Sequence, residues 1–185
     1  MQKIIKHRIT AATIGTLILT AYSILGTGDP NAKLLGMSLE IMSGASVIGI
    51  ALLMYPYLKP YSKKLSLGYL LIKMIEGALA IIAGILFYIH SASLLAIREI
   101  IYLIHGYIFA IPALILYYLL YQSKLVPGWL SIWGIIASLL LIGINILELL
   151  ISHIPQNEIL YLPIVANEIV LAVWLIIKGF NLRRA

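Results

Sequence analysis

The stretch that decides the fold is residues 66–89, SLGYLLIKMIEGALAIIAGILFYI. It is long and apolar enough to cross a membrane as one helix, because about 20 apolar residues cover about 30 Å of hydrocarbon. Lys73 and Glu76 nevertheless lie near its middle. Ionisable residues inside a span are costly, and they belong either to a structural ion pair or to a functional site. The stretch therefore predicts a membrane helix with a polar centre.

Five further segments have the same apolar character, so the sequence predicts an all-α fold of six transmembrane helices in an antiparallel bundle. The five segments are residues 9–25, 34–58, 94–121, 128–151 and 158–177. Short connections separate them, and short connections make consecutive helices antiparallel neighbours. Residues 1–185 are expected to form a single domain.

The composition excludes several other classes of protein. The chain is 62% hydrophobic and 11% charged, whereas a soluble domain is roughly half apolar and a quarter charged. It has no cysteine, which excludes disulfides and thiolate metal sites. The net charge is +6, but the basic residues cluster near the predicted helix ends and form no stripe that would grip a phosphate backbone. We therefore expect no nucleic-acid partner.

The distribution of Lys and Arg predicts the orientation. With a cytoplasmic N-terminus, only Lys33 and Arg98 lie on the outer side, Lys73 lies within the third segment, and the other ten of the 13 basic residues lie inside. These ten are Lys3, Lys6, Arg8, Lys59, Lys63, Lys64, Lys124, Lys178, Arg183 and Arg184. Because basic residues favour the cytoplasmic side, the sequence predicts a multi-pass protein of the cell membrane. Both termini are expected in the cytoplasm, and the lipid bilayer is the first expected partner.

Polar residues spaced by three and four predict one polar stripe along each helix. In the first segment the stripe includes Thr13, Thr16 and Thr20. We expect the six stripes to converge on a common axis and to leave the Leu and Ile faces to lipid. Small and hydroxyl residues in such stripes are explained by ordinary helix packing, whereas the charged residues require a further explanation.

Depth in the membrane groups the charged residues. At about 1.5 Å per residue, Glu76, His105 and Glu168 lie about 15 Å from the ends of their segments, near the midplane. Glu40, Asn145 and Glu148 lie nearer the outer surface, with Arg98 nearby, and these four residues are expected to line the mouth of a polar pocket that opens outward. The candidate ligand-binding residues are Glu76, His105, Glu168, Arg98, Glu40, Asn145, Glu148, Asn167 and Lys73.

Three interpretations of this polar centre remain open. In the first, it is purely structural: Lys73 pairs with Glu76, and Arg98 pairs with Glu99, Glu40 or Glu148, because intramembrane charges commonly pair with one another. In the second, the pocket binds a small molecule, a lipid headgroup or an ion, and could serve transport. No internal repeat of the kind found in transporters is visible, and a homodimer is compatible with the sequence.

The third interpretation is a membrane-embedded, metal-dependent hydrolase. Glu76, His105 and Glu168 are of the residue types that hold a divalent metal, which would act as the cofactor and activate water. The sequence has no His-Glu-x-x-His motif and no second midplane His to support such a site.

Two stretches resemble a known family. Residues 121–134, YQSKLVPGWLSIWG, are similar to its Tyr-x-Ser-Arg/Lys-Leu-hydrophobic-Pro-x-Trp-Leu-Ser segment. Residues 163–181 resemble its closing segment, which pairs a Glu in the last span with a terminal Lys-Gly-Phe. The pattern Lys73-x-x-Glu76 is similar to its basic-x-x-Glu pattern, with Lys where Arg is expected. The family comprises bacterial and archaeal membrane proteins grouped as domain of unknown function 4386.

This resemblance extends over nearly the whole chain, and it implies a polytopic membrane protein without implying an activity. It draws attention to the residues that carry the shared patterns. These are Lys73, Glu76, Glu168, Lys178, Gly179 and Phe180.

Overall fold

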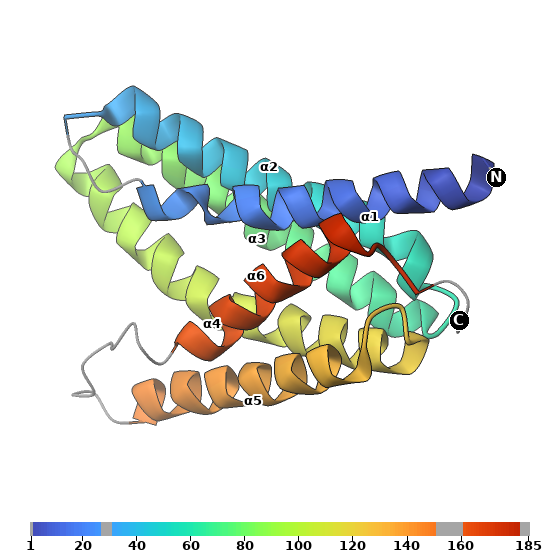
Figure 1. The fold of residues 1–185 in the computed structure, drawn as a ribbon. Coiled ribbons are helices and arrows are strands. Elements are labelled where there is room, and N and C mark those ends of the chain that lie inside the picture. The colour runs from blue at the N-terminus through green and yellow to red at the C-terminus, as the bar shows by residue number, and fades with distance from the viewer. Residues whose placement is uncertain (1, 27–30, 151–160, 182–185) are drawn as a thin grey trace.

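A computed structural model describes residues 2–26, 31–150 and 161–181, and every regular element in these ranges is helical (Figure 1). The elements are α1 (Gln2–Ala21), the 3₁₀-helix η1 (Tyr22–Gly26), α2 (Lys33–Leu58), α3 (Lys63–Ile89), α4 (Ala92–Ser123), α5 (Gly128–Leu150) and α6 (Leu162–Ile177). The all-α prediction is thus confirmed. The expected start of the last segment, residues 158–160, lies outside the described residues, as do Asp29 and Glu158.

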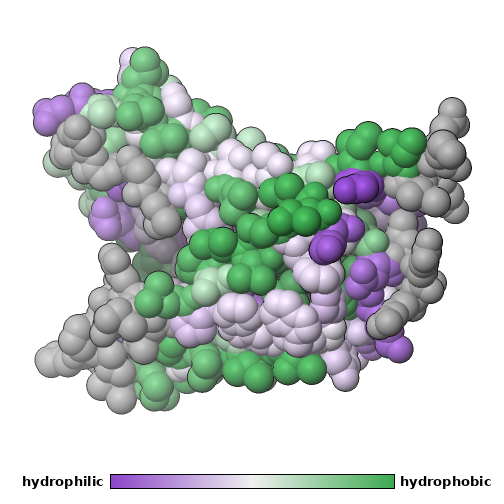
Figure 2. Space-filling model, viewed as in Figure 1, coloured by the Kyte–Doolittle hydropathy of each residue, from purple (hydrophilic) through white to green (hydrophobic). Residues whose placement is uncertain are grey.

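Four helices, α2 to α5, are long and apolar enough to cross a membrane. The described part of α6 is apolar but has only 16 residues. Large apolar side chains are exposed on all six α-helices, and Figure 2 shows them over much of the visible face. A bilayer would cover such a surface, whereas soluble monomers rarely expose contiguous apolar patches larger than a few hundred Å². The protein is therefore a helical membrane protein.

Local sequence signals explain where the helices begin and end. Ser62 and Ser91 precede α3 and α4, and each hydroxyl accepts a hydrogen bond from a backbone N–H in the first turn. Ser is a favoured N-cap residue for this reason. His90 and Lys124 follow α3 and α4 in the left-handed conformation, with φ of 56° and 54°, which turns the chain back at once.

The helices pack in the order of the chain and then close on themselves. Each α-helix contacts the next one along the sequence, and α6 also contacts α1. A close approach occurs between α2 and α3, where Gly44 and Gly77 face each other across the interface. Glycines allow two helix backbones to approach in this way. The result is a closed ring of helices, in which α3 and α6 do not pack against each other.

The predicted polar stripe of α1 does not face this centre. Thr13 and Thr16 are exposed, and the hydroxyl of each donates a hydrogen bond to the carbonyl four residues earlier in the same helix. The buried face of α1 instead carries Ala11, Ile14 and Ile18. The expectation that all six stripes converge was wrong here, because a Thr hydroxyl can be satisfied by its own helix backbone.

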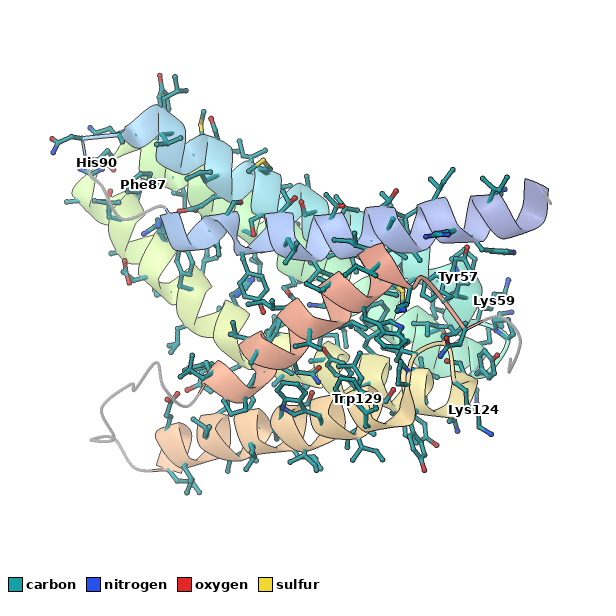
Figure 3. All side chains as sticks on the ribbon, viewed as in Figure 1. Tyr57, Lys59, Phe87, His90, Lys124 and Trp129 are labelled. Atoms are coloured by element: carbon teal, nitrogen blue, oxygen red, sulfur yellow. The ribbon has the colours of Figure 1, made fainter. Side chains whose placement is uncertain are left out.

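The two ends of the molecule differ in charge. Figure 3 shows Lys59 and Lys124 at one end, with Tyr57 beside Lys59, while His90 lies at the opposite end. The start of α1 and the end of α6 lie at the lysine-rich end (Figure 1). Figure 2 shows the molecule hollowed at the opposite end.

Candidate functional site

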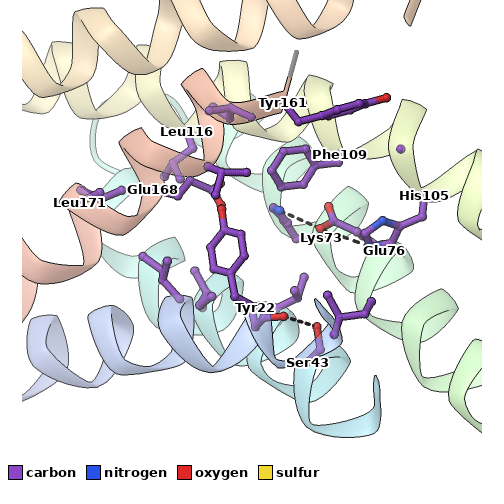
Figure 4. A pocket seen from close by; sticks show the side chains of 18 of the residues that line it. Tyr22, Ser43, Lys73, Glu76, His105, Phe109, Leu116, Tyr161, Glu168 and Leu171 are labelled. Atoms are coloured by element: carbon purple, nitrogen blue, oxygen red, sulfur yellow. Dashed lines mark hydrogen bonds and ion pairs between the residues drawn. The ribbon is translucent and has the colours of Figure 1, made fainter. Parts of the chain in front are cut away.

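A central cavity of about 270 Å³ lies inside the ring of helices (Figure 4). Its lining comes from α1, η1, α2, α3, α4 and α6, together with the residue that precedes α6. Most of the lining side chains are aliphatic or aromatic. The side chains with polar atoms are Tyr22, Ser43, Tyr69, Lys73, Glu76, His105, Tyr161 and Glu168. The three residues expected near the midplane, Glu76, His105 and Glu168, therefore line the same cavity from three different helices.

Glu76 is the buried centre of one polar group. Lys73, three residues earlier on α3, donates a hydrogen bond of 2.9 Å from Nζ to Glu76 Oε1. The Nε2 atom of His105, on α4, lies 3.9 Å from the same oxygen, which is too far for a hydrogen bond. Glu76 is 1% exposed, and its Oε2 atom has no hydrogen-bond partner among the described residues. One carboxylate oxygen is thus paired, and the other is buried and unpaired.

Glu168 is held by a different partner. The hydroxyl of Tyr22 donates a hydrogen bond of 2.7 Å to Glu168 Oε2. Tyr22 opens η1, so the switch from α-helix to 3₁₀-helix after Ala21 accompanies its turn toward α6 (Figure 4). The hydroxyl of Ser43 on α2 donates a hydrogen bond of 2.6 Å to the carbonyl of Ala21, the last residue of α1. Tyr22 therefore links the end of α1 to the carboxylate of α6.

A second cavity, of about 480 Å³, adjoins the first. The two cavities share His105, Gly106 and Tyr161 in their linings. Asn145 and Glu148 of α5 line the second cavity, and Asn145 Nδ2 donates a hydrogen bond of 3.3 Å to the carbonyl of Gly106. Two of the residues expected at the mouth of the pocket thus lie next to the central cavity.

Arg98 and Glu40 form a separate ion pair. Arg98 Nη2 lies 2.6 Å from Glu40 Oε1, and the guanidinium lies over the rings of Phe87 and Tyr102, 4.8 and 4.6 Å from their centroids. Glu99 lies 3.7 Å from Arg98 but is mostly exposed. Neither Arg98 nor Glu40 is among the lining residues of the two cavities. The pair therefore joins α2 to α4 beside the cavities.

Asn167 also lines neither of the two cavities. Its Nδ2 atom donates a hydrogen bond of 3.0 Å to the carbonyl of Leu130, and its side chain is fully buried. Asn167 is adjacent to Glu168 in sequence, but it faces α5 while Glu168 lines the central cavity. Its contact fastens α6 to the start of α5.

The geometry gives no metal-ligand group. Among the described residues, no three His, Cys, Asp or Glu side chains are arranged to hold a metal ion. Glu76, His105 and Glu168 line one cavity, but Glu76 pairs with Lys73, and Glu168 accepts its bond from Tyr22.

The sequence analysis missed three tyrosines that line the central cavity. They are Tyr22, Tyr69 and Tyr161. A buried tyrosine hydroxyl usually has a hydrogen-bond partner, and this rule was an available signal for Tyr22, which binds Glu168. The hydroxyl of Tyr69 is buried and has no hydrogen-bond partner among the described residues. The spacing of polar residues did not predict Tyr22, because it does not belong to the Thr and Ser stripe of its segment.

The two family-like stretches meet at the lysine-rich end. Leu125 and Val126, in the turn between α4 and α5, are buried there. Gly179 adopts a φ of +72°, which ends the C-terminal helix and directs Phe180 against Tyr57, with ring centroids 4.5 Å apart. The backbone N–H of residue 181 then donates a hydrogen bond of 2.8 Å to the carbonyl of Leu125. Together the two stretches form one packed unit at this end of the ring.

Fold and site together define a helical membrane protein with an internal cavity that contains buried acids. A family model described as a domain of unknown function, DUF4386, matches residues 19–95 and 88–179. The chain belongs to this family, as the resemblance predicted. No curated protein and no solved structure matches the chain.

Proposed function

We propose that all six α-helices cross the cell membrane, with both termini in the cytoplasm. The 20 residues of α1 extend about 30 Å at about 1.5 Å per residue, which is the thickness of the hydrocarbon layer. The described part of α6 is shorter, but it packs against both α1 and α5 within the ring. The cluster of lysines at one end supports the cytoplasmic assignment of that end.

We further propose that the protein binds a small molecule in the central cavity, entering from the outer side through the second cavity. The observation that carries this proposal is the convergence of Glu76, His105 and Glu168 on one cavity, whose other lining side chains are mostly aliphatic or aromatic. Its volume is near the lower end of the range for small-molecule sites, about 300–1,000 Å³. Buried side chains, including Leu125 and Phe180, close the lysine-rich end of the ring. This packing favours entry of the ligand from the opposite, outer end.

A purely structural role fits Arg98 and Glu40 better than it fits the central acids. Arg98 is packed between two aromatic rings, and Glu40 Oε1 is fully engaged by it. Glu40 Oε2 and Glu76 Oε2 are both buried without a hydrogen-bond partner among the described residues, but Glu76 lines the central cavity and Glu40 lines neither cavity. A buried polar atom without a partner costs about 1–3 kcal/mol, so a site that keeps one next to a cavity favours a ligand that completes it.

Cavity filling tests this proposal. Val47 lines the cavity from α2, and Leu52 on the same helix is exposed. We expect Val47→Phe to weaken the binding of small aromatic probes by about tenfold or more, since loss of a fitted contact of about 1.4 kcal/mol has that effect. Leu52→Phe is the matched control and should leave binding unchanged. Equilibrium dialysis against protein in phosphatidylcholine nanodiscs measures the binding, with empty discs subtracted.

If Val47→Phe does not fold, Ile164→Phe tests the same space from α6. Binding that is equal in wild type and in a folded cavity-filling variant would contradict the proposal. Binding that is no greater than to empty discs would contradict it as well.

A further inference from the structure

We infer that the ligand of the central cavity is a small lipophilic cation, an alkyl or aromatic amine whose ammonium group pairs with Glu168. The inference rests on the proposed binding function and specifies the chemistry of the ligand. It follows from the balance of charges in the cavity, from the partners that the two acids already have, and from the character of the remaining lining.

The charges that line the cavity are unequal. Glu76 and Glu168 supply two carboxyl groups, and Lys73 supplies the only Lys or Arg side chain among the lining residues. His105 carries a charge only when it is protonated, and its Nε2 atom lies 3.9 Å from Glu76 Oε1. The cavity therefore has more acidic groups than fixed positive charges.

The single lysine is already engaged. Its ammonium group donates to Glu76 at 2.9 Å and lies 4.6 Å from the centroid of the Phe109 ring. Glu168 forms an ion pair with none of the described basic residues, and the hydroxyl that it binds, from Tyr22, is neutral. Glu168 is therefore the lining acid that has no ion-pair partner among the described residues.

Glu76 offers a second acceptor in the same cavity. Its Oε2 atom is buried without a partner, in a side chain that is 1% exposed. An ammonium group carries several N–H donors and needs several acceptors once it leaves water. A buried charge of this kind is tolerated when it is both paired and hydrogen-bonded. Glu168 and Glu76 Oε2 each offer such an acceptor, and the Tyr69 hydroxyl, which lines the cavity without a hydrogen-bond partner among the described residues, can accept as well as donate.

The rest of the lining selects an apolar body. Aliphatic side chains from α1, α2, α4 and α6 form much of the wall, and the rings of Tyr22, Tyr69, Phe109 and Tyr161 also line it. Aromatic faces attract cations in desolvated sites. The structure thus matches a molecule with one positive group on a hydrocarbon body more closely than a hydrated metal ion or a sugar.

The pairing does not depend on how Glu168 is protonated before the ligand arrives. If it is a carboxylate, a protonated amine pairs with it directly. If it is a carboxylic acid, a neutral amine accepts its proton, which leaves an ammonium group beside a carboxylate. In both cases the bound state is the same ion pair, and no other reactant is needed.

A matched set of naphthalene probes tests the inference: 1-naphthylmethylamine, 1-naphthylmethanol and 1-naphthoate. We expect wild type in phosphatidylcholine nanodiscs, with empty discs subtracted, to bind the amine at least about tenfold more tightly than the alcohol, a difference of about 1.4 kcal/mol. Glu168→Gln should remove the preference for the amine and leave binding of the alcohol unchanged. Lys64→Gln, at an exposed lysine that lines neither cavity, is the control and should keep the preference.

Wild type that binds the alcohol or the carboxylate as tightly as the amine would overturn the inference and leave the proposed binding function intact. A preference for the amine that survives in Glu168→Gln would also overturn it. If no probe binds above empty discs, both the inference and the proposed function fail. If Glu168→Gln does not fold, the comparison of the three probes on wild type still decides the charge preference.

Discussion

At the scale of single residues, the two buried ion pairs found among the described residues have different surroundings. The guanidinium of Arg98 lies over two aromatic rings, and its partner Glu40 is 0% exposed. Lys73 and Glu76 line an open cavity. Removing one partner of a buried pair leaves an uncompensated charge, while replacing both partners removes the desolvation cost. For both pairs, the change in stability on removing one partner should therefore differ from the change on replacing both partners.

Arg98→Ala should destabilise the protein by about 3–5 kcal/mol, because it leaves Glu40 buried without its counter-charge. The double variant Glu40→Leu/Arg98→Met should recover most of that loss. Thermal unfolding in dodecyl maltoside, followed by circular dichroism, measures both changes. A single variant as stable as wild type would show that the pair does not hold α2 to α4.

Lys73→Met combined with Glu76→Leu should give a protein about 1–4 kcal/mol more stable than wild type, because well-packed apolar residues often stabilise when they replace a buried pair. The same variant should bind amines more weakly, since it removes the acceptor at Glu76. Glu99→Leu, at an exposed site, is the control and should change stability by less than about 0.5 kcal/mol. A double variant that is less stable than wild type would favour a structural role for the pair.

At the scale of elements, the sequence predicted the helices better than it predicted their faces. The limits of α2 to α5 lie within a few residues of the apolar segments, because long apolar runs bounded by turn residues leave little choice inside a bilayer. The outward-facing Thr stripe of α1 could not be foreseen from spacing alone. Spacing cannot tell a hydroxyl that bonds across helices from one that bonds to its own backbone.

Partners in space were harder still to predict. The depth argument brought Glu76, His105 and Glu168 to one level, and they line one cavity. The choice of Glu40 for Arg98, and of Tyr22 for Glu168, depends on the rotation of each helix about its axis. That rotation is set by packing between helices, which a single sequence does not specify.

The close contact between α2 and α3 gives a prediction at this scale. A methyl group added at Gly77 would meet the backbone carbonyl of Gly44 and the side chain of Ile48. We expect Gly77→Ala to destabilise the protein by about 1–3 kcal/mol through overpacking. Gly68→Ala on the same helix is the matched control, because nothing lies within 4 Å of its added methyl group.

The control should be neutral or stabilising by up to about 1 kcal/mol, since alanine favours a helix over glycine. Both variants are measured by thermal unfolding in dodecyl maltoside. Equal stability of the two variants would contradict the described packing of α2 on α3.

At the scale of the whole molecule, the lysine-rich (basic) end of the ring of helices lies opposite an end with few basic residues. Lys59, Lys63, Lys64 and Lys124 lie in or beside the turns of the basic end. The opposite end carries the turn between α3 and α4, which contains Ser91. The proposed orientation assigns the basic end to the cytoplasm.

Single cysteines can test this orientation, because the natural chain has none. We expect Ser93→Cys, at the outer end, to react with a membrane-impermeant maleimide in intact cells. Gln122→Cys, at the basic end, should react only after lysis. Both side chains are exposed in the structure, so accessibility within the protein is matched, and the opposite labelling pattern would reverse the orientation.

The central claim is that acids from separate helices share one interior cavity that receives a cationic ligand. The most direct measurement is a crystal structure of the protein grown from lipid with 1-naphthylmethylamine. We predict ligand density between α3, α4 and α6, with the amine nitrogen about 2.7–2.9 Å from a Glu168 oxygen, as in charge-assisted hydrogen bonds. A map in which Glu76 and Glu168 point to different sides, or in which aliphatic side chains fill the space between them, would contradict the claim.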